Sequence, residues 1–127
     1  MKALYSLAVL AALAAGSAHA ACSYPKAPDN IPDGNTATLE QMIAAQKAVK
    51  QFDQEISAYT ACLKLENDNA LAQVDQSEND PKKKEEQKKE LERVQIQKHN
   101  AAVEEDEALA QRFNEQLKVF KAKAAKK

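Results

Sequence analysis

The chain has 127 residues, and its 18 basic side chains nearly balance its 19 acidic ones, giving a formal net charge of −1. This balance excludes an obligate polyanionic partner, such as nucleic acid, held by bulk charge. Only two glycines and no tryptophan occur, while alanine, lysine, glutamate and glutamine dominate from residue 38 onward. Such a composition is typical of long helices, and it leaves no glycine-rich loop for binding phosphate groups.

The N-terminal segment has the features of a cleavable secretory signal peptide. A basic start at Lys2 precedes an apolar run over residues 3–15, and an A-x-A cleavage site ends at Ala20. The run is shorter than the roughly 20 residues that a membrane-spanning helix needs. We expect cleavage near Ala20-Ala21, which leaves a mature chain with no transmembrane segment, in the periplasm or outside a bacterial cell.

Two cysteines, Cys22 and Cys62, follow the predicted cleavage site. An even number of cysteines in an exported chain favours a disulfide formed in an oxidising compartment. Their wide spacing excludes a C-x-x-C redox motif and a haem attachment site. Lipidation of Cys22 is the alternative, but His19 stands where a lipobox normally has an aliphatic residue.

The positions of the four prolines divide the rest of the chain. Three of them lie between residues 25 and 32, and the fourth is Pro81. Proline interrupts helices, so the proline-free stretches between and after them fit two helices. We therefore expect a signal peptide over 1–20, a proline-rich leader over 21–37, a helical hairpin over 38–122 with its turn at about 77–80, and a basic tail over 123–127.

The first helix has a clear start and a regular apolar pattern. Thr38 and Gln41 have the spacing of a capping box, in which two side chains satisfy unpaired backbone N–H groups. Apolar residues then recur at alternating spacings of three and four, as in the seam of a left-handed coiled coil. Asn67-Asp68-Asn69 weakens the pattern, so we expect this helix to end between Leu65 and Gln76. The seam residues are Met42, Ala45, Val49, Phe52, Ile56, Tyr59 and Leu63.

The second helix is predicted to begin at Asp80-Pro81, because aspartate is a favoured N-cap and proline suits the first helical position. Its apolar seam is thinner than the first, and Lys98 and Asp106 fall near it. Beyond Phe120 no large apolar side chain remains, so we expect the last turns to be held weakly. The seam residues are Leu91, Val94, Ala102, Leu109, Phe113, Leu117 and Phe120.

Two helices bury only one stripe each, so this hairpin needs a third layer for a stable core. The leader or a second copy of the chain could provide it. A Cys22–Cys62 disulfide favours the leader, because about 16 extended residues reach roughly 50 Å and the helix from Thr38 to Cys62 is about 36 Å long. We predict an all-α fold: an antiparallel, coiled-coil-like two-helix hairpin with an N-terminal proline-rich extended leader tied to the first helix by a disulfide.

Four short segments carry a recognisable combination of residues: CSYPKAP at 22–28, IPDG at 31–34, AQKAVK at 45–50 and YTACL at 59–63. In these segments, together with Met42, the chain resembles small exported proteobacterial proteins of unassigned function. The likeness covers about a third of the chain. It implies a shared fold of leader, disulfide and helix, and it carries no activity or functional residue over to this chain.

Residues with catalytic or metal-binding chemistry do not form a recognisable site in the sequence. His99 has no potential ligand three or four residues away, where a helical metal site needs one. The carboxylates of Glu104-Glu105-Asp106-Glu107 point in different directions on a helix, because consecutive positions rotate by about 100°. No serine or cysteine lies near a base. We therefore predict no catalytic residue, no metal site and no cofactor.

Lysine clusters are the remaining unusual feature. One cluster opens the second helix around Lys82-Lys83-Lys84, and neighbouring glutamates dilute it. The other cluster follows the last acidic residue, Glu115, and could contact an anionic surface, although lysines in a last turn also complement the helix dipole. Its members are Lys118, Lys121, Lys123, Lys126 and Lys127.

These observations rank the function classes. The first is an exported cell-envelope interaction or structural protein that uses the helical hairpin as a docking surface without catalysis, its partner an envelope protein or a second copy. The alternative is an electrostatic binder of an anionic surface, whether lipid, lipopolysaccharide or nucleic acid, through the C-terminal lysines. An enzyme or metal carrier ranks last.

Overall fold

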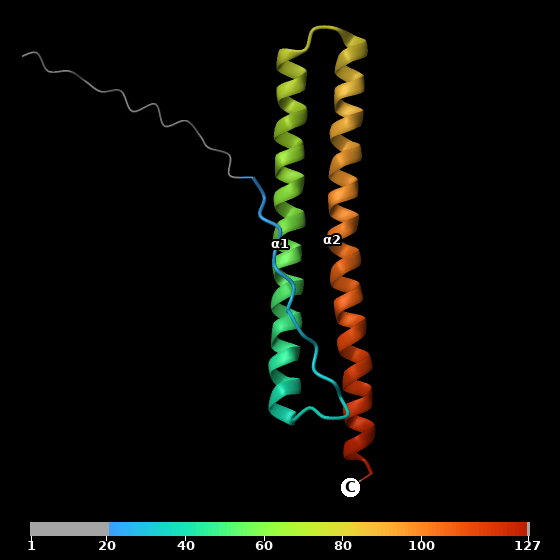
Figure 1. The fold of residues 1–127 in the computed structure, drawn as a ribbon. Helices are drawn as coiled ribbons and strands as arrows, with labels where there is room; N and C mark the ends of the chain where they lie inside the picture. The colour runs from blue at the N-terminus through green and yellow to red at the C-terminus, as the bar shows by residue number, and fades with distance from the viewer. Residues whose placement is uncertain (1–20, 127) are drawn as a thin grey trace, which may run out of the picture.

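The computed structural model describes residues 21–126, so the predicted signal peptide and Lys127 lie outside the described residues. Within this range the chain forms two helices and no strand, α1 (Leu39–Ser77) and α2 (Pro81–Ala124). The two helices run side by side in opposite directions, and the leader lies along them near the end where the hairpin is open (Figure 1). The predicted all-α hairpin is confirmed. Neither helix of the described part is long and apolar enough to cross a membrane.

Side-chain caps explain where the two helices begin. The backbone N–H of Gln41 donates to Thr38 Oγ1, and the backbone N–H of Thr38 donates to Gln41 Oε1, which completes the predicted capping box. Asp80 accepts hydrogen bonds from the first N–H groups of α2, at Lys82 and Lys83. A cap of this kind typically stabilises a helix by about 1 kcal/mol.

The end of α1 differs from the sequence prediction. The helix continues without a break through Asn67-Asp68-Asn69 and ends at Ser77, beyond the predicted interval. Lys64 and Asp68 form an ion pair of 2.6 Å one turn apart, and Asp75 near the helix end pairs with Lys88 of α2 at 2.6 Å. Leu71 and Val74 are half-buried in these turns, so apolar contacts also continue past Asn69, whereas the sequence pattern gave weight to the loss of apolar residues.

The core follows the predicted seam. All seven seam residues of α1 are buried, and Phe52 is only 1% exposed. From α2, Ala102, Leu109 and Phe113 are buried, while Leu91 and Leu117 are half-buried. Burying one large apolar side chain contributes roughly 1.5–3 kcal/mol, so this shared seam is the main source of stability.

The leader forms the third layer, as the disulfide suggested. Cys22 and Cys62 are bonded, with their Cα atoms 5.8 Å apart, and the side chains of Ala27 and Ile31 pack against the core. The expectation placed the leader along the first helix, but it also contacts α2. The ring of Tyr24 packs edge-on against Tyr59 of α1 at a centroid distance of 5.0 Å, and its hydroxyl reaches Glu105 of α2.

A turn around Gly34 closes the open end of the hairpin. The carbonyl of Asp33 accepts hydrogen bonds from Thr36 and Ala37, and the N–H of Gly34 donates to Gln116 Oε1 of α2 at 2.8 Å. A Cβ atom at position 34 would lie only 2.8 Å from the backbone nitrogen of Phe120 and would overlap the carbonyl oxygen of Gln116. Glycine is therefore required by this close approach of two backbones.

The last turns of α2 are helical as far as Ala124, two residues past the expected limit of the hairpin. Phe120 is half-buried and packs against the core, and Lys123 Nζ donates to the carbonyl oxygen of Asn35 at 2.6 Å. The turn of the leader thus holds the end of α2, a contact between residues far apart in the sequence that local propensity could not reveal.

The hairpin consists of two halves that differ in packing. The proximal half consists of residues 37–63, from the leader turn and α1, and residues 101–124 of α2. The distal half consists of residues 64–100. Every buried core residue lies in the proximal half. Among the described residues, the distal half contains only half-buried or exposed apolar side chains, such as Val74, Leu91 and Val94. The change occurs close to the Cys22–Cys62 disulfide.

Candidate functional site

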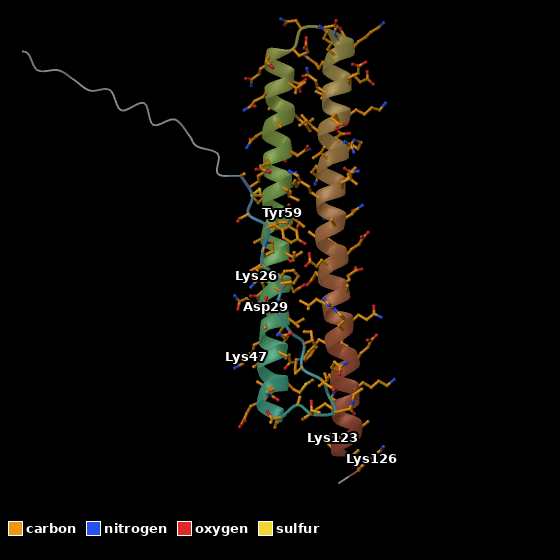
Figure 2. The ribbon with its side chains drawn as sticks, viewed as in Figure 1. Lys26, Asp29, Lys47, Tyr59, Lys123 and Lys126 are labelled. Atoms are coloured by element: carbon orange, nitrogen blue, oxygen red, sulfur yellow. A yellow bond between two sulfur atoms is a disulfide. The ribbon has the colours of Figure 1, made fainter. Side chains whose placement is uncertain are left out.

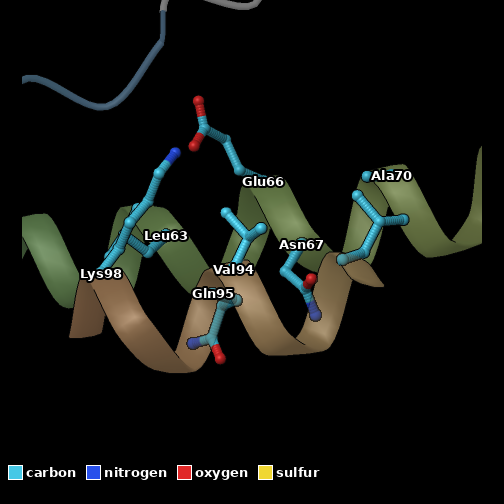
Figure 3. Close-up of a pocket in the computed structure, with 8 residues that line it drawn as sticks. Leu63, Glu66, Asn67, Ala70, Val94, Gln95 and Lys98 are labelled. Atoms are coloured by element: carbon cyan, nitrogen blue, oxygen red, sulfur yellow. The ribbon is translucent and has the colours of Figure 1, made fainter. Parts of the chain in front are cut away.

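A groove opens between the helices directly beyond the end of the leader. It has a volume of about 270 Å³, and we call it the distal groove. Figure 3 shows Leu63 and Val94 between the two helices, and Glu66 and Lys98 extending to the same side of the groove. The lining residues are Leu63, Glu66, Asn67, Ala70, Leu91, Val94, Gln95 and Lys98.

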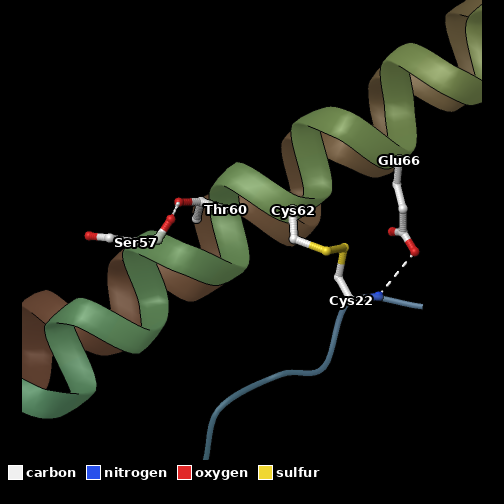
Figure 4. Close-up of a disulfide and its surroundings, with 5 residues drawn as sticks. All are labelled: Cys22, Ser57, Thr60, Cys62 and Glu66. Atoms are coloured by element: carbon white, nitrogen blue, oxygen red, sulfur yellow. Dashed lines mark hydrogen bonds between the residues drawn. A yellow bond between two sulfur atoms is a disulfide. The ribbon is translucent and has the colours of Figure 1, made fainter. Parts of the chain in front are cut away.

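Two contacts fix the leader at the entrance of the distal groove. The disulfide joins Cys22 to Cys62, and the N–H of Cys22 donates to Glu66 Oε1 at 3.0 Å, one helical turn further on (Figure 4). Closing a loop of 40 residues stabilises a folded chain by roughly 4 kcal/mol in the chain-entropy description. The leader is thus attached to α1 at the point where the distal groove begins.

The chemistry of the distal groove suits an extended chain with apolar side chains. Leu63, Leu91 and Val94 provide an apolar floor, and Asn67 and Gln95 add amide groups that can both donate and accept hydrogen bonds. A groove with an apolar floor and a few polar groups is the usual form of a binding site. Glu66 and Lys98 add one carboxylate and one ammonium group to its lining.

A pair of carboxyl groups bridges the helices in the proximal half. Asp106 of α2 is half-buried, and its Oδ1 atom has no hydrogen-bond partner among residues 21–126. Burial and a shared hydrogen bond with Asp53 of α1 raise the pKa of Asp106, and the negative charges of Asp53 and Glu107 add to the effect. Two carboxyl groups share a hydrogen bond only when one of them is protonated, so proton uptake strengthens this helix contact.

The leader contacts α2 through the side chain of Tyr24. The hydroxyl of Tyr24 donates to Glu105 Oε2 at 2.5 Å. Burial, followed by this hydrogen bond, raises the pKa of Tyr24 to about 12. The phenol therefore stays protonated over the physiological range and keeps the leader attached to α2.

The residues considered from the sequence are spread over several surfaces. His99 is half-buried beside Ser57 and Thr60, and no group of three or more potential metal ligands occurs in the described range. Two members of the acidic run contact other elements, Glu105 at Tyr24 and Asp106 at Asp53. Four of the five C-terminal lysines are described and exposed, Lys118, Lys121, Lys123 and Lys126.

The distal groove was not predicted from the apolar pattern of the helices. A signal for it was present, because Asn67, Gln95 and Lys98 interrupt the apolar seams of both helices in the same region. Polar residues at seam positions indicate a helix contact that stays accessible to solvent or to a ligand.

No family model matches the chain, and comparison with curated proteins and with solved structures gave no match. Any function assigned to the distal groove or to the lysines must therefore follow from the residues of this chain and their arrangement.

Proposed function

We propose that this chain is an exported cell-envelope protein that acts without catalysis, by presenting its helical hairpin as a docking surface. The distal groove is the docking site in this proposal, and its occupant is an extended apolar segment of a partner envelope protein. One observation carries the proposal: among residues 21–126 the leader packs against the core from Cys22 onward, and an apolar groove lies between the helices on the other side of the Cys22–Cys62 disulfide.

The leader itself indicates what kind of segment the hairpin accepts. It is extended, it contains three prolines, and it packs small and branched apolar side chains such as Ala27 and Ile31 between the helices. A partner segment of the same character would continue this layer over Ala70 and Leu91. It would also give the distal half the third layer that the hairpin needs for full burial.

Export is the second part of the proposal. The signal-peptide features of the first 20 residues support it, and a Cys22–Cys62 disulfide is consistent with an oxidising compartment. The resemblance to small exported proteobacterial proteins agrees with the same location.

Affinity capture from envelope extract tests the proposal, with residues 21–127 as bait in their oxidised form. Ala70→Arg places a long charged side chain in the distal groove, whereas Ala72→Arg adds the same group at an exposed position of α1. We expect the original bait and Ala72→Arg to retain one partner at both low and high salt, and Ala70→Arg to lose it.

Cross-linking from a photoreactive residue at Leu91 should then locate the contact in an extended segment of that partner. Retention of the same partner by Ala70→Arg, or capture that disappears at high salt for every bait, would contradict docking in the distal groove.

A further inference from the structure

Apolar side chains are exposed at the open end of the hairpin, far from the distal groove. Leu39 in the first turn of α1 is 63% exposed, and Ile43 one turn later is 43% exposed. They line a second groove together with residues from the end of α2, among them Leu117 and Phe120, and no leader residue lines it. We call this surface the open-end groove.

Positive charge gathers at the end of α2, next to the open-end groove. From Gln116 to Lys126 the chain has four lysines and no acidic residue, and all four lysines are exposed. Lys121 lines the open-end groove itself. Figure 2 shows Lys123 and Lys126 at the open end and Lys47 on the outer side of α1. Glu40 is the one acidic residue in the first turn of α1.

The helix dipole accounts for part of this charge, because cations stabilise the C-terminal end of a helix. That effect is confined to the last turn, where Lys121 and Lys123 lie, and Lys123 also binds the carbonyl of Asn35. It does not explain Lys118, and it does not explain exposed leucine and isoleucine beside the lysines. Exposed apolar side chains with lysines beside them are the pattern of a surface that enters the boundary between lipid headgroups and acyl chains.

We propose that the open end of the hairpin docks on the surface of an anionic lipid bilayer. Leu39, Ile43 and Phe120 enter the headgroup boundary, and the lysines of the last turns of α2 contact the phosphate groups. The hairpin then stands away from the membrane with its distal groove exposed to solvent. This contact is independent of the partner segment assigned to the distal groove.

Vesicle co-sedimentation of residues 21–127 tests the charge contribution. Vesicles of phosphatidylglycerol and phosphatidylcholine should bind the protein, and vesicles of phosphatidylcholine alone should not. The double change Lys118→Gln/Lys121→Gln should weaken binding about thirtyfold, since each lysine near an anionic surface contributes about fivefold. The control Lys82→Gln/Lys83→Gln removes the same charge at the other end of the hairpin and should bind as the original chain does.

A matched pair of leucines tests the apolar contribution. Leu39 and Leu65 are 63% and 65% exposed, so substitution of either by serine leaves the core intact. Leu39→Ser should weaken vesicle binding roughly tenfold, because a leucine that enters the boundary loses its apolar contact. Leu65→Ser should have no effect. Circular dichroism should show the same helix content for both variants.

Three results would overturn the proposal. They are equal binding to neutral and anionic vesicles, equal weakening by the two lysine pairs, and retention of full binding by Leu39→Ser. Binding of the protein to duplex DNA through Lys118 and Lys121, without vesicle binding, would also exclude the lipid surface.

Raising the ionic strength from about 0.1 M to about 1 M shortens the screening length from about 10 Å to about 3 Å and should release the protein from anionic vesicles.

Discussion

The proximal and distal halves of the hairpin are built from the same two helices, yet only one of them has a closed core. In the proximal half the leader covers the seam, and Phe52 and Leu109 are each 1% exposed. In the distal half the seam includes Asn67 and Gln95, and the apolar residues beside them stay half-buried. The third layer, more than helix propensity, decides how far the interface closes.

The two halves therefore differ in how much they stabilise the fold and in how accessible their apolar side chains are. The proximal half holds the fold together through the disulfide, the buried seam and the turn at Gly34. The distal half extends beyond these constraints, held by surface ion pairs such as Asp75 with Lys88, and such pairs contribute little. The described chain thus has a closed core in its proximal half and an apolar groove in its distal half.

The largest expected difference concerns two leucines on α2. Leu109→Ala should lower the free energy of unfolding by roughly 3 kcal/mol, within the range of 2–5 kcal/mol for buried leucines. Leu91→Ala, the same change in the distal half, should cost about 1 kcal/mol or less, because Leu91 is only half-buried. Chemical denaturation followed by circular dichroism measures both values. Equal losses would show that the two halves are packed alike.

A smaller effect is expected at the turn of the leader. Gly34→Ala should destabilise the protein by about 1–3 kcal/mol, because its methyl group would collide with the backbone of α2. Thr36→Ala, an exposed position in the same turn, serves as the control. Hydrogen exchange of the Gly34 amide checks this control. If the turn stays closed in Thr36→Ala, that amide should exchange no faster than in the original chain.

Whether Gly34→Ala lowers or raises the stability of the protein distinguishes two arrangements of the turn. Substituting glycine by alanine at an unstrained position usually stabilises a protein by about 0.4–1 kcal/mol through the unfolded state. A stabilised Gly34→Ala variant would therefore show that the turn does not rest on α2, and the leader would then be a layer on α1 alone.

Much of the fold follows from local sequence signals. Thr38 with Gln41, and Asp80 with Pro81, mark the starts of both helices, and the spacing from Met42 to Leu63 identifies the buried seam. The cysteine count in a chain with signal-peptide features was enough to propose the disulfide. These features depend on residues close together or on one simple pairing.

The features that were missed depend on contacts between distant residues. The last turns of α1 contact α2 through Asp75 and Lys88, and the last turns of α2 contact the leader through the bond from Lys123 to Asn35. The distal groove lies beyond the point where Cys22 of the leader is bonded to Cys62, and the path of the leader cannot be derived from local sequence signals. Periodicity along one helix reports none of these.

The smallest predicted effect lies at the carboxyl pair of the proximal half. Because the pKa of Asp106 is raised in the folded protein, its contribution to stability is complete below its ordinary pKa of about 3.9 and is lost as the pH rises through the raised value. Asp75 and Glu90 act in the opposite sense, since their lowered pKa values make stability fall as the pH decreases. A variant of Asp106 is therefore needed to separate its contribution to the pH dependence of stability from theirs.

Asp106→Asn replaces the carboxyl with an amide that can donate a hydrogen bond to Asp53 at every pH. At pH 7 the variant should be more stable than the original chain by on the order of 1 kcal/mol, because a poorly satisfied buried carboxylate is removed. The advantage should shrink as the pH falls towards the ordinary pKa of aspartate, about 3.9, because the folded protein takes up a proton at Asp106 before the unfolded chain does. Glu104→Gln removes the same charge at an exposed position of α2 and should show no such pH dependence. Denaturation curves from pH 4 to pH 7 measure the difference, and a constant gap across this range would mean that Asp106 does not titrate at the helix contact.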